Sequence, residues 1–208
     1  MCSSIFTKFL EKISFCDLKA FDIILKNIPA KTDVQLANST PVRYSNLYNT
    51  MANRNLFGYS NRGTSGIDGT ISTAAGAAYA SKKSTTVISG DLSFFYDSNA
   101  LMNQHLPQNL RIIIINNGGG NIFRIIDGPS QTDELEQFFE TKHNWSAEFI
   151  AKAFGVDYYL CKEEKSLQKT LDKVYAASYK QCCVVEIKTQ GDKNSEILLQ
   201  YFDYLKKN

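Results

Sequence analysis

The sequence predicts an α/β protein built on a doubly wound parallel sheet with helices on both faces. Short apolar segments alternate with helical segments along the chain, and polar, glycine-rich turns follow several of the apolar segments. One apolar segment contains the run Ile112-Ile113-Ile114-Ile115. A strand buried on both faces requires such a continuous apolar run, and helices between parallel strands fit the crossovers of this kind of sheet.

The individual elements follow from this alternation. We expect strands at residues 33–38, 55–60, 85–89, 110–116, 156–161 and 182–188. We expect helices from about residue 17 to Pro29, at residues 70–83, from about Lys165 to Tyr179, and after residue 188. No repeat or low-complexity linker divides the chain, so these elements form one domain.

Length and composition agree with one well-buried domain. The chain has 208 residues, of which 43% are hydrophobic and 21% are charged. We assign residues 17–208 to the domain and residues 1–16 to a leader or linker helix, since Phe6, Phe9 and Leu10 recur at helical spacing. Charged residues interrupt this helix, which excludes a membrane span or signal peptide.

Charge and cysteine usage narrow the cellular context. The net charge of +2 comes from interspersed charges with no long basic run, so we expect no nucleic-acid partner. The five cysteines form no Cys-x-x-Cys pair, and Cys182 and Cys183 lie in a predicted buried strand. This usage favours reduced cysteines and a cytoplasmic protein.

Two polar turns follow neighbouring predicted strands, GDLS at residues 90–93 and NNGGG at residues 116–120. Ligands of parallel sheets bind beyond the carboxyl ends of the strands, so the two turns can converge on one ligand. Asp91 offers a carboxylate oxygen, Asn117 an amide oxygen, and the glycines an inward-facing backbone carbonyl, which together suit Mg²⁺. Helix amino termini after each turn are expected to donate N–H groups to phosphates. Either turn alone is common in ordinary loops, but the pair predicts a metal-phosphate site.

The same stretches resemble a known family. A Gly-Asp turn followed, after a helix and a strand, by Asn-Asn resembles the metal and diphosphate signature of thiamine diphosphate enzymes, although Leu92 replaces the usual glycine. The form GDLSxxYDxNxL with NNxGGxIF is similar to the 2-succinyl-5-enolpyruvyl-6-hydroxy-3-cyclohexene-1-carboxylate synthases of menaquinone biosynthesis. ANSTPVRY (37–44) resembles that family's N-S-x-x-x-R element, and SNRGTSGIDGTISTAAG (60–76) its signature between two strands. The chain is similar to the family's C-terminal, diphosphate-binding domain.

The resemblance implies roles for individual residues. Mg²⁺ would be bound by Asp91, Asn117 and the backbone carbonyl of Gly119. Thiamine diphosphate would be contacted by Ser39, Gly66, Ile67, Leu92, Ser93 and Gly120, with Ile67 wedged beneath the cofactor. Substrates would be bound by Arg43, Arg62, Ile122 and Phe123. A guanidinium suits the carboxylates of such substrates, although an isolated arginine is more often a solvated surface charge.

The resemblance also implies a reaction and partners. The family enzyme decarboxylates 2-oxoglutarate and adds the resulting succinyl-semialdehyde unit to isochorismate. The activating glutamate belongs to a pyrimidine-binding domain of a second subunit, so we expect a fragment of a homo-oligomeric enzyme, with no catalytic residue of its own and inactive alone. Another thiamine diphosphate carboligase or decarboxylase, similar to acetolactate synthase, and a non-catalytic cofactor-binding module remain alternatives.

The two histidines are the remaining candidates for acid–base chemistry. His105 and His143 lie in polar stretches outside the matched motifs. A lone histidine in such a stretch is usually exposed to solvent, so neither is assigned a role.

Overall fold

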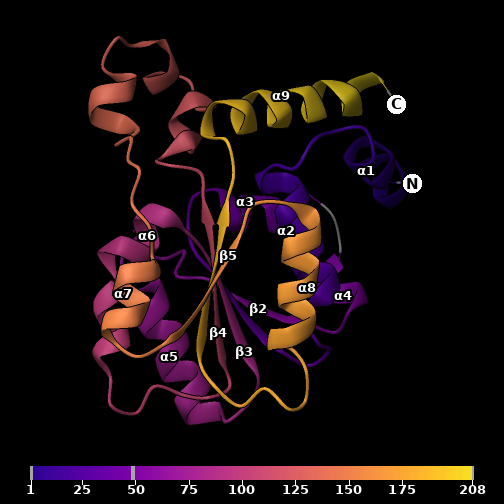
Figure 1. Cartoon of the computed structure of the whole chain (residues 1–208). Coiled ribbons are helices and arrows are strands. Elements are labelled where there is room, and N and C mark those ends of the chain that lie inside the picture. The colour runs from indigo at the N-terminus through magenta and orange to yellow at the C-terminus, as the bar shows by residue number, and fades with distance from the viewer. Residues whose placement is uncertain (1, 48–49, 208) are drawn as a thin grey trace.

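In a computed structural model, which describes residues 2–47 and 50–207, one parallel sheet organises the chain. The strands lie in the order β2 (Phe57–Tyr59), β1 (Asp33–Leu36), β3 (Thr85–Gly90), β4 (Leu110–Asn116), β6 (Cys183–Lys188) and β5 (Asp157–Cys161). Every neighbouring pair is parallel. The predicted α/β class with a parallel sheet is therefore confirmed, and Figure 1 shows the strands between two layers of helices.

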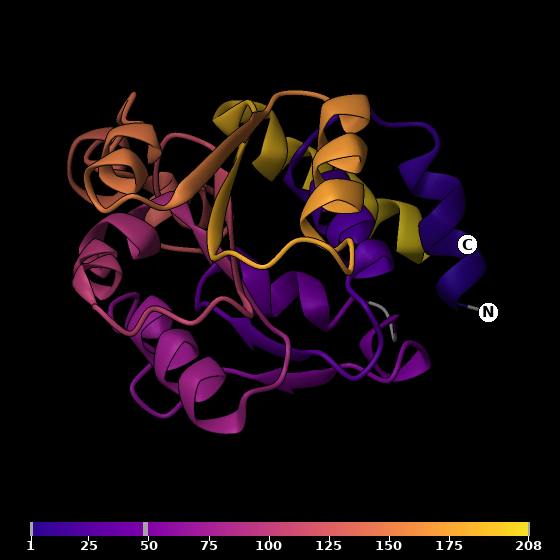
Figure 2. The same cartoon turned by 60° about the horizontal axis from the view of Figure 1, so that its bottom comes forward.

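The helices cover both faces of the sheet (Figures 1 and 2). The α-helices are α1 (Cys2–Leu10), α2 (Asp17–Asn27), α3 (Thr40–Ser45), α4 (Thr50–Asn53), α5 (Thr70–Ser81), α6 (Asp91–Tyr96), α7 (Glu148–Ala153), α8 (Glu164–Val174) and α9 (Gly191–Lys207). Shorter helical turns are η1 (Ser98–Met102), η2 (Asn121–Arg124), η3 (Pro129–Gln131) and η4 (Leu135–Phe139). Helices α5, α6 and α7 pack on one face, and α1, α2, α8 and α9 contribute to the core of the other.

The isoleucine run of β4 explains how one strand serves two cores. Ile113 and Ile115 belong to the cluster beneath α2 and α8, whereas Ile112 and Ile114 belong to the cluster beneath α5 and α7. Successive side chains of a strand point to opposite faces, so a strand covered on both sides needs apolar residues at every position. All four isoleucines are buried.

Helix α1 corresponds to the amphipathic pattern at the start of the chain. Its buried residues Phe6 and Phe9 pack against Tyr201 of α9, with ring centroids 5.3 and 5.2 Å apart. Its apolar face is thus part of the main core. Across residues 2–47 and 50–207, every helix is too short or too polar to cross a bilayer.

The prediction of a helix from about Lys165 to Tyr179 is wrong at the carboxyl end, because α8 ends at Val174. Arg111, a buried residue of β4, explains this end. Its guanidinium donates to the backbone oxygens of Val174, Tyr179 and Gln181 at 2.7 to 3.3 Å. These carbonyls therefore satisfy a buried cation instead of extending the helix.

The side chains of Cys16, Cys161, Cys182 and Cys183 are free thiols. Burial raises the pKa of Cys16 to about 11 and that of Cys183 to about 11. Cys183 is buried in β6 as expected, whereas Cys182 lies just before that strand and is half-buried against the core. Packing is therefore the role that their positions indicate.

Candidate functional site

A cavity of about 500 Å³ opens at the carboxyl ends of β1, β3 and β4. Its volume lies within the range of roughly 300 to 1,000 Å³ that is usual for small-molecule sites. The turns after four strands bring together twelve of the thirteen site residues expected from the sequence: Ser39, Arg43, Arg62, Ile67, Asp91, Leu92, Ser93, Asn117, Gly119, Gly120, Ile122 and Phe123. Gly66 does not line the cavity, but its carbonyl accepts a hydrogen bond from Asn38, which does.

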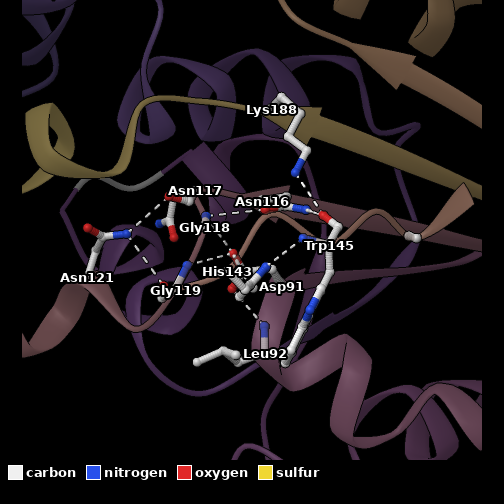
Figure 3. A network of polar contacts seen from close by, with 12 residues as sticks. Asp91, Leu92, Asn116, Asn117, Gly118, Gly119, Asn121, His143, Trp145 and Lys188 are labelled. Carbon is white, nitrogen blue, oxygen red and sulfur yellow. Dashed lines mark hydrogen bonds and ion pairs between the residues drawn. The ribbon is translucent and has the colours of Figure 1, made fainter. Parts of the chain in front are cut away.

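Asp91 is the buried carboxylate at the centre of the site (Figure 3), and it is only 3% exposed. Its Oδ2 accepts the backbone N–H groups of Gly118 and Gly119 at 2.8 and 3.1 Å. Its Oδ1 accepts the N–H of Leu92 at 2.7 Å. The turn after β3 is thereby fastened to the turn after β4, with the Asp91 side chain in the cavity wall.

The Asn117 side chain is hydrogen-bonded to a second buried carboxylate, that of Asp17, which lies outside the cavity lining. Its Nδ2 donates to Oδ2 of Asp17, the first residue of α2, at 2.6 Å. Asp17 is fully buried, and burial raises its pKa to about 6 although hydrogen bonds from Thr189, Asn117 and Asn194 act in the opposite direction. The amide of Asn121, which lines the cavity, lies 2.7 Å from Oδ1 of Asn117.

The glycine turn can adopt its path only without side chains. Gly119 has φ of 150°, and a Cβ there would lie 2.6 Å from the backbone oxygen of Glu140. The N–H of Gly120 donates to that same oxygen at 2.6 Å. Glu140 is itself fixed because both of its carboxylate oxygens accept hydrogen bonds from Arg124 at 2.7 Å. The segment after η2 thus folds back and supports the turn.

The expectation that His143 is exposed is wrong, whereas His105 is exposed as expected. The His143 side chain is 1% exposed, and its Nε2 lies 3.3 Å from Oδ2 of Asp91 without the alignment of a hydrogen bond. Its ring stacks on Trp145 with centroids 4.6 Å apart, and its backbone N–H donates to the carbonyl of Gly118. His143 therefore closes the far side of the Asp91 turn.

Two arginines, Arg43 and Arg62, line the same cavity. Arg43 of α3 donates to the carbonyl of Ser39 at 2.8 Å, and Arg62 donates to Oδ1 of Asn38 at 2.7 Å. Within residues 2–47 and 50–207, neither guanidinium forms an ion pair with a carboxylate. Ser39 has φ of 73°, an uncommon value for a residue other than glycine, and such strain is often found at functional sites.

Ile67 is hydrogen-bonded to the first turn of α6. The hydroxyl of Ser93 donates to the carbonyl of Ile67 at 2.5 Å, which joins the turn before α5 to the start of α6. Ile122 and Phe123 of η2 supply apolar surface to the same cavity, and Phe123 packs against Phe139 with centroids 5.6 Å apart. The cavity therefore combines a polar floor with apolar walls.

The residues present fit a magnesium–diphosphate group. The lining includes the Asp91 carboxylate, the Asn117 amide and Gly119, whose carbonyl is the third expected ligand. Mg²⁺ commonly takes few protein oxygens when phosphates and waters supply the rest. No cluster of three His, Cys, Asp or Glu side chains suited to a metal occurs in the described part of the chain. Helix amino termini contribute less than expected, because the glycine turn leads into the four-residue turn η2 and α6 has only six residues.

Several polar residues in or next to the cavity have no role assigned from the sequence, among them Asn38, Asn121, Asp17 and His143. Asn38 and Asn121 lie inside the quoted motifs, so their signal was present in the chain. Asp17 and His143 lie far from these motifs, and only the fold brings them to Asn117 and Asp91.

Comparison with known families gives one match over most of the chain. The model of the thiamine pyrophosphate enzymes, C-terminal TPP-binding domain, matches residues 39–187. This range contains all the residues expected to form the site.

Curated relatives carry one shared name, 2-succinyl-5-enolpyruvyl-6-hydroxy-3-cyclohexene-1-carboxylate synthase. The protein of Christiangramia forsetii is 43% identical over 198 residues, which cover 95% of this chain and 34% of that protein. The protein of Flavobacterium psychrophilum is 43% identical over 197 residues (95% and 35%), and that of Cytophaga hutchinsonii 44% over 191 residues (92% and 34%). The chain thus spans about a third of the length of these relatives.

Gly119→Ala should destabilise the protein by about 3 kcal/mol, because it adds a steric collision to a backbone conformation that is nearly restricted to glycine. Gly155→Ala is the matched control, since Gly155 has φ of 66° but open space around it. That change should cost only about 1 kcal/mol. Urea unfolding of the two variants checks this difference, and an equal loss in both would contradict the steric role of Glu140.

Proposed function

The chain belongs to the thiamine pyrophosphate enzymes, whose C-terminal TPP-binding domain it contains, and on this premise we propose that it anchors Mg²⁺ and thiamine diphosphate in the cavity beyond β3 and β4. We further propose that it does so as part of a 2-succinyl-5-enolpyruvyl-6-hydroxy-3-cyclohexene-1-carboxylate synthase. The names of its relatives support this assignment. The substrates would be 2-oxoglutarate and isochorismate.

The main support for the proposal is that the turns after four strands meet at one cavity. Residues from the turns after β1, β2, β3 and β4 line one cavity, although they span from Ser39 to Phe123 in the sequence. Asp91 and Asn117 come from the turns after β3 and β4, and Arg43 and Arg62 follow β1 and β2. Each of these guanidinium groups donates to one neutral oxygen of the chain. A ligand with a metal-bound diphosphate and a substrate with carboxylates both find matching chemistry there.

The metal would be held by Asp91, Asn117 and the carbonyl of Gly119. The Asp91 carboxylate already receives two glycine N–H groups on Oδ2, so it is fixed before a metal arrives. Ligands held in place lose little conformational entropy on binding. Leu92, Ser93 and Gly120 lie beside them in the cavity wall, where they would face the diphosphate.

The substrate side would be formed by Arg43 and Arg62 with Ile122 and Phe123. Guanidinium groups bind carboxylates by paired, charge-assisted hydrogen bonds. Thiamine diphosphate, when bound, supplies an electron sink for decarboxylation and carbon–carbon bond formation. Ile67 would support the cofactor from below, and the apolar walls would exclude water from the reacting groups.

A pyrimidine-binding domain of a second subunit would complete the site. The chain spans about a third of its relatives, and none of the cavity residues is a glutamate. We propose that the activating glutamate comes from that domain, that the enzyme is a homo-oligomer, and that residues 1–208 alone are inactive. A cytoplasmic location is part of the same proposal.

Asp91→Asn should weaken Mg²⁺-dependent binding of thiamine diphosphate to the full-length protein by more than about 100-fold, since it removes the charged ligand. Asp203→Asn is the control, because that carboxylate is exposed on α9. Isothermal titration calorimetry of both variants measures the effect. Wild-type affinity in Asp91→Asn would refute the metal assignment.

Arg43→Ala and Arg62→Ala should each weaken substrate binding by about 1.5 to 3 kcal/mol, the usual value of a charge-assisted hydrogen bond. Affinity for thiamine diphosphate should change far less, because the proposed partners are substrate carboxylates. Steady-state kinetics of the full-length enzyme with 2-oxoglutarate and isochorismate provide the measurement, with Lys169→Ala on the exposed surface of α8 as the control. Unchanged kinetics in both arginine variants would mean that these residues are surface charges.

A further inference from the structure

Asp17 is a buried carboxylate that belongs to none of the site motifs. It opens α2 and lies outside the cavity lining, but it contacts Asn117 a hundred residues away in the sequence. A buried carboxylate is unfavourable unless polar groups compensate it. Here the amide of Asn117 and the hydroxyl of Thr189 both donate to it.

We propose that Asp17 is a positioning residue that sets the orientation of the Asn117 amide, an inference that rests on the proposed metal site. A primary amide has a donor end and an acceptor end, whereas a carboxylate only accepts. Asp17 can therefore bond only the Nδ2 end of Asn117. The Oδ1 end then points away from Asp17 and lies 2.7 Å from the Asn121 amide, another residue of the cavity lining. An amide oxygen has two lone pairs, so Oδ1 can accept a metal with the second.

Asp17 is itself fixed by groups at the start of α9. Thr189 donates to Oδ1 of Asp17, and the backbone N–H of Asp17 donates to Oδ1 of Asn194 at 2.8 Å. Asn194 in turn donates to Thr189 at 3.3 Å. The N–H of Thr189 donates to the carbonyl of Asn116, next to the residue that Asp17 orients. These bonds fix the Asp17 carboxylate relative to the turn after β4, which carries Asn117.

Outer partners of this kind tune metal sites because they fix the direction of the coordinating atom. Without Asp17, the amide of Asn117 could rotate and present its NH₂ group to the cavity, which cannot bind a cation. A purely structural role for Asp17, joining α2 to α9, would affect stability but not metal affinity. The two roles therefore differ in what a metal titration measures.

The test is electron paramagnetic resonance of Mn²⁺ bound to the full-length protein in the presence of thiamine diphosphate, with thermal unfolding of each variant. Asp17→Leu should raise the Mn²⁺ dissociation constant by about tenfold or more, the usual effect of losing a residue that orients a metal ligand. Asp22→Leu is the matched control, since Asp22 is a buried carboxylate of the same helix that pairs with Lys26 instead. It should leave Mn²⁺ affinity near that of the wild type.

A charge exchange keeps the test decisive if Asp17→Leu fails to fold. Asn117→Asp alone places two carboxylates together and should weaken Mn²⁺ binding. Combining it with Asp17→Asn should restore affinity to within about threefold of the wild type, because the introduced amide can donate to the introduced carboxylate.

Two results would overturn the inference: folded Asp17→Leu with wild-type Mn²⁺ affinity, or a folded double variant that is no better than Asn117→Asp. Wild-type protein that binds no Mn²⁺ with thiamine diphosphate would instead refute the proposed function itself.

Discussion

The parallel pairing of β3 with β4 is the constraint on which the site depends. The register runs from Thr85 opposite Leu110 to Gly90 opposite Ile115, so both strands end at the same edge of the sheet. A slip of one residue would reverse the faces of every side chain in the strand. The isoleucines of β4 would tolerate that slip, because both faces of the strand carry the same side chain. The register is fixed instead at the strand ends, where Arg111 donates to the carbonyls of Val174 and Gln181 and Asp91 accepts the N–H groups of Gly118 and Gly119.

Buried carboxylates then give the edge its rigidity. Asp17, Asp91 and Glu140 are all at most 3% exposed, and each accepts hydrogen bonds from groups far away in the sequence. A buried charge without such donors costs several kcal/mol. Moving either the carboxylate or its donors is therefore unfavourable, and the hydrogen-bonded segments stay in place. Of the three carboxylates, Asp91 lines the cavity, while Asp17 and Glu140 hold Asn117 and the glycine turn in place behind it.

The strands and the cavity could be predicted because local patterns determine them. The isoleucine run indicates a doubly covered strand, and the motifs GDLS and NNGGG follow directly from strand ends. The contacts of Asp17 and His143 could not be predicted, because they arise from packing between elements distant in the sequence. The end of α8 was missed for the same reason, since it depends on Arg111 of another strand.

The central claim is that this edge of the sheet holds a diphosphate through Mg²⁺, and a comparison of thiamine diphosphate with thiamine tests it most directly. Calorimetric titration of each into the full-length protein, with and without Mg²⁺, separates the diphosphate from the rest of the cofactor. We expect tight binding only for thiamine diphosphate and only with Mg²⁺, because the proposed ligands contact the metal and the phosphates. Equal binding of thiamine, or binding of thiamine diphosphate that does not depend on Mg²⁺, would contradict the claim.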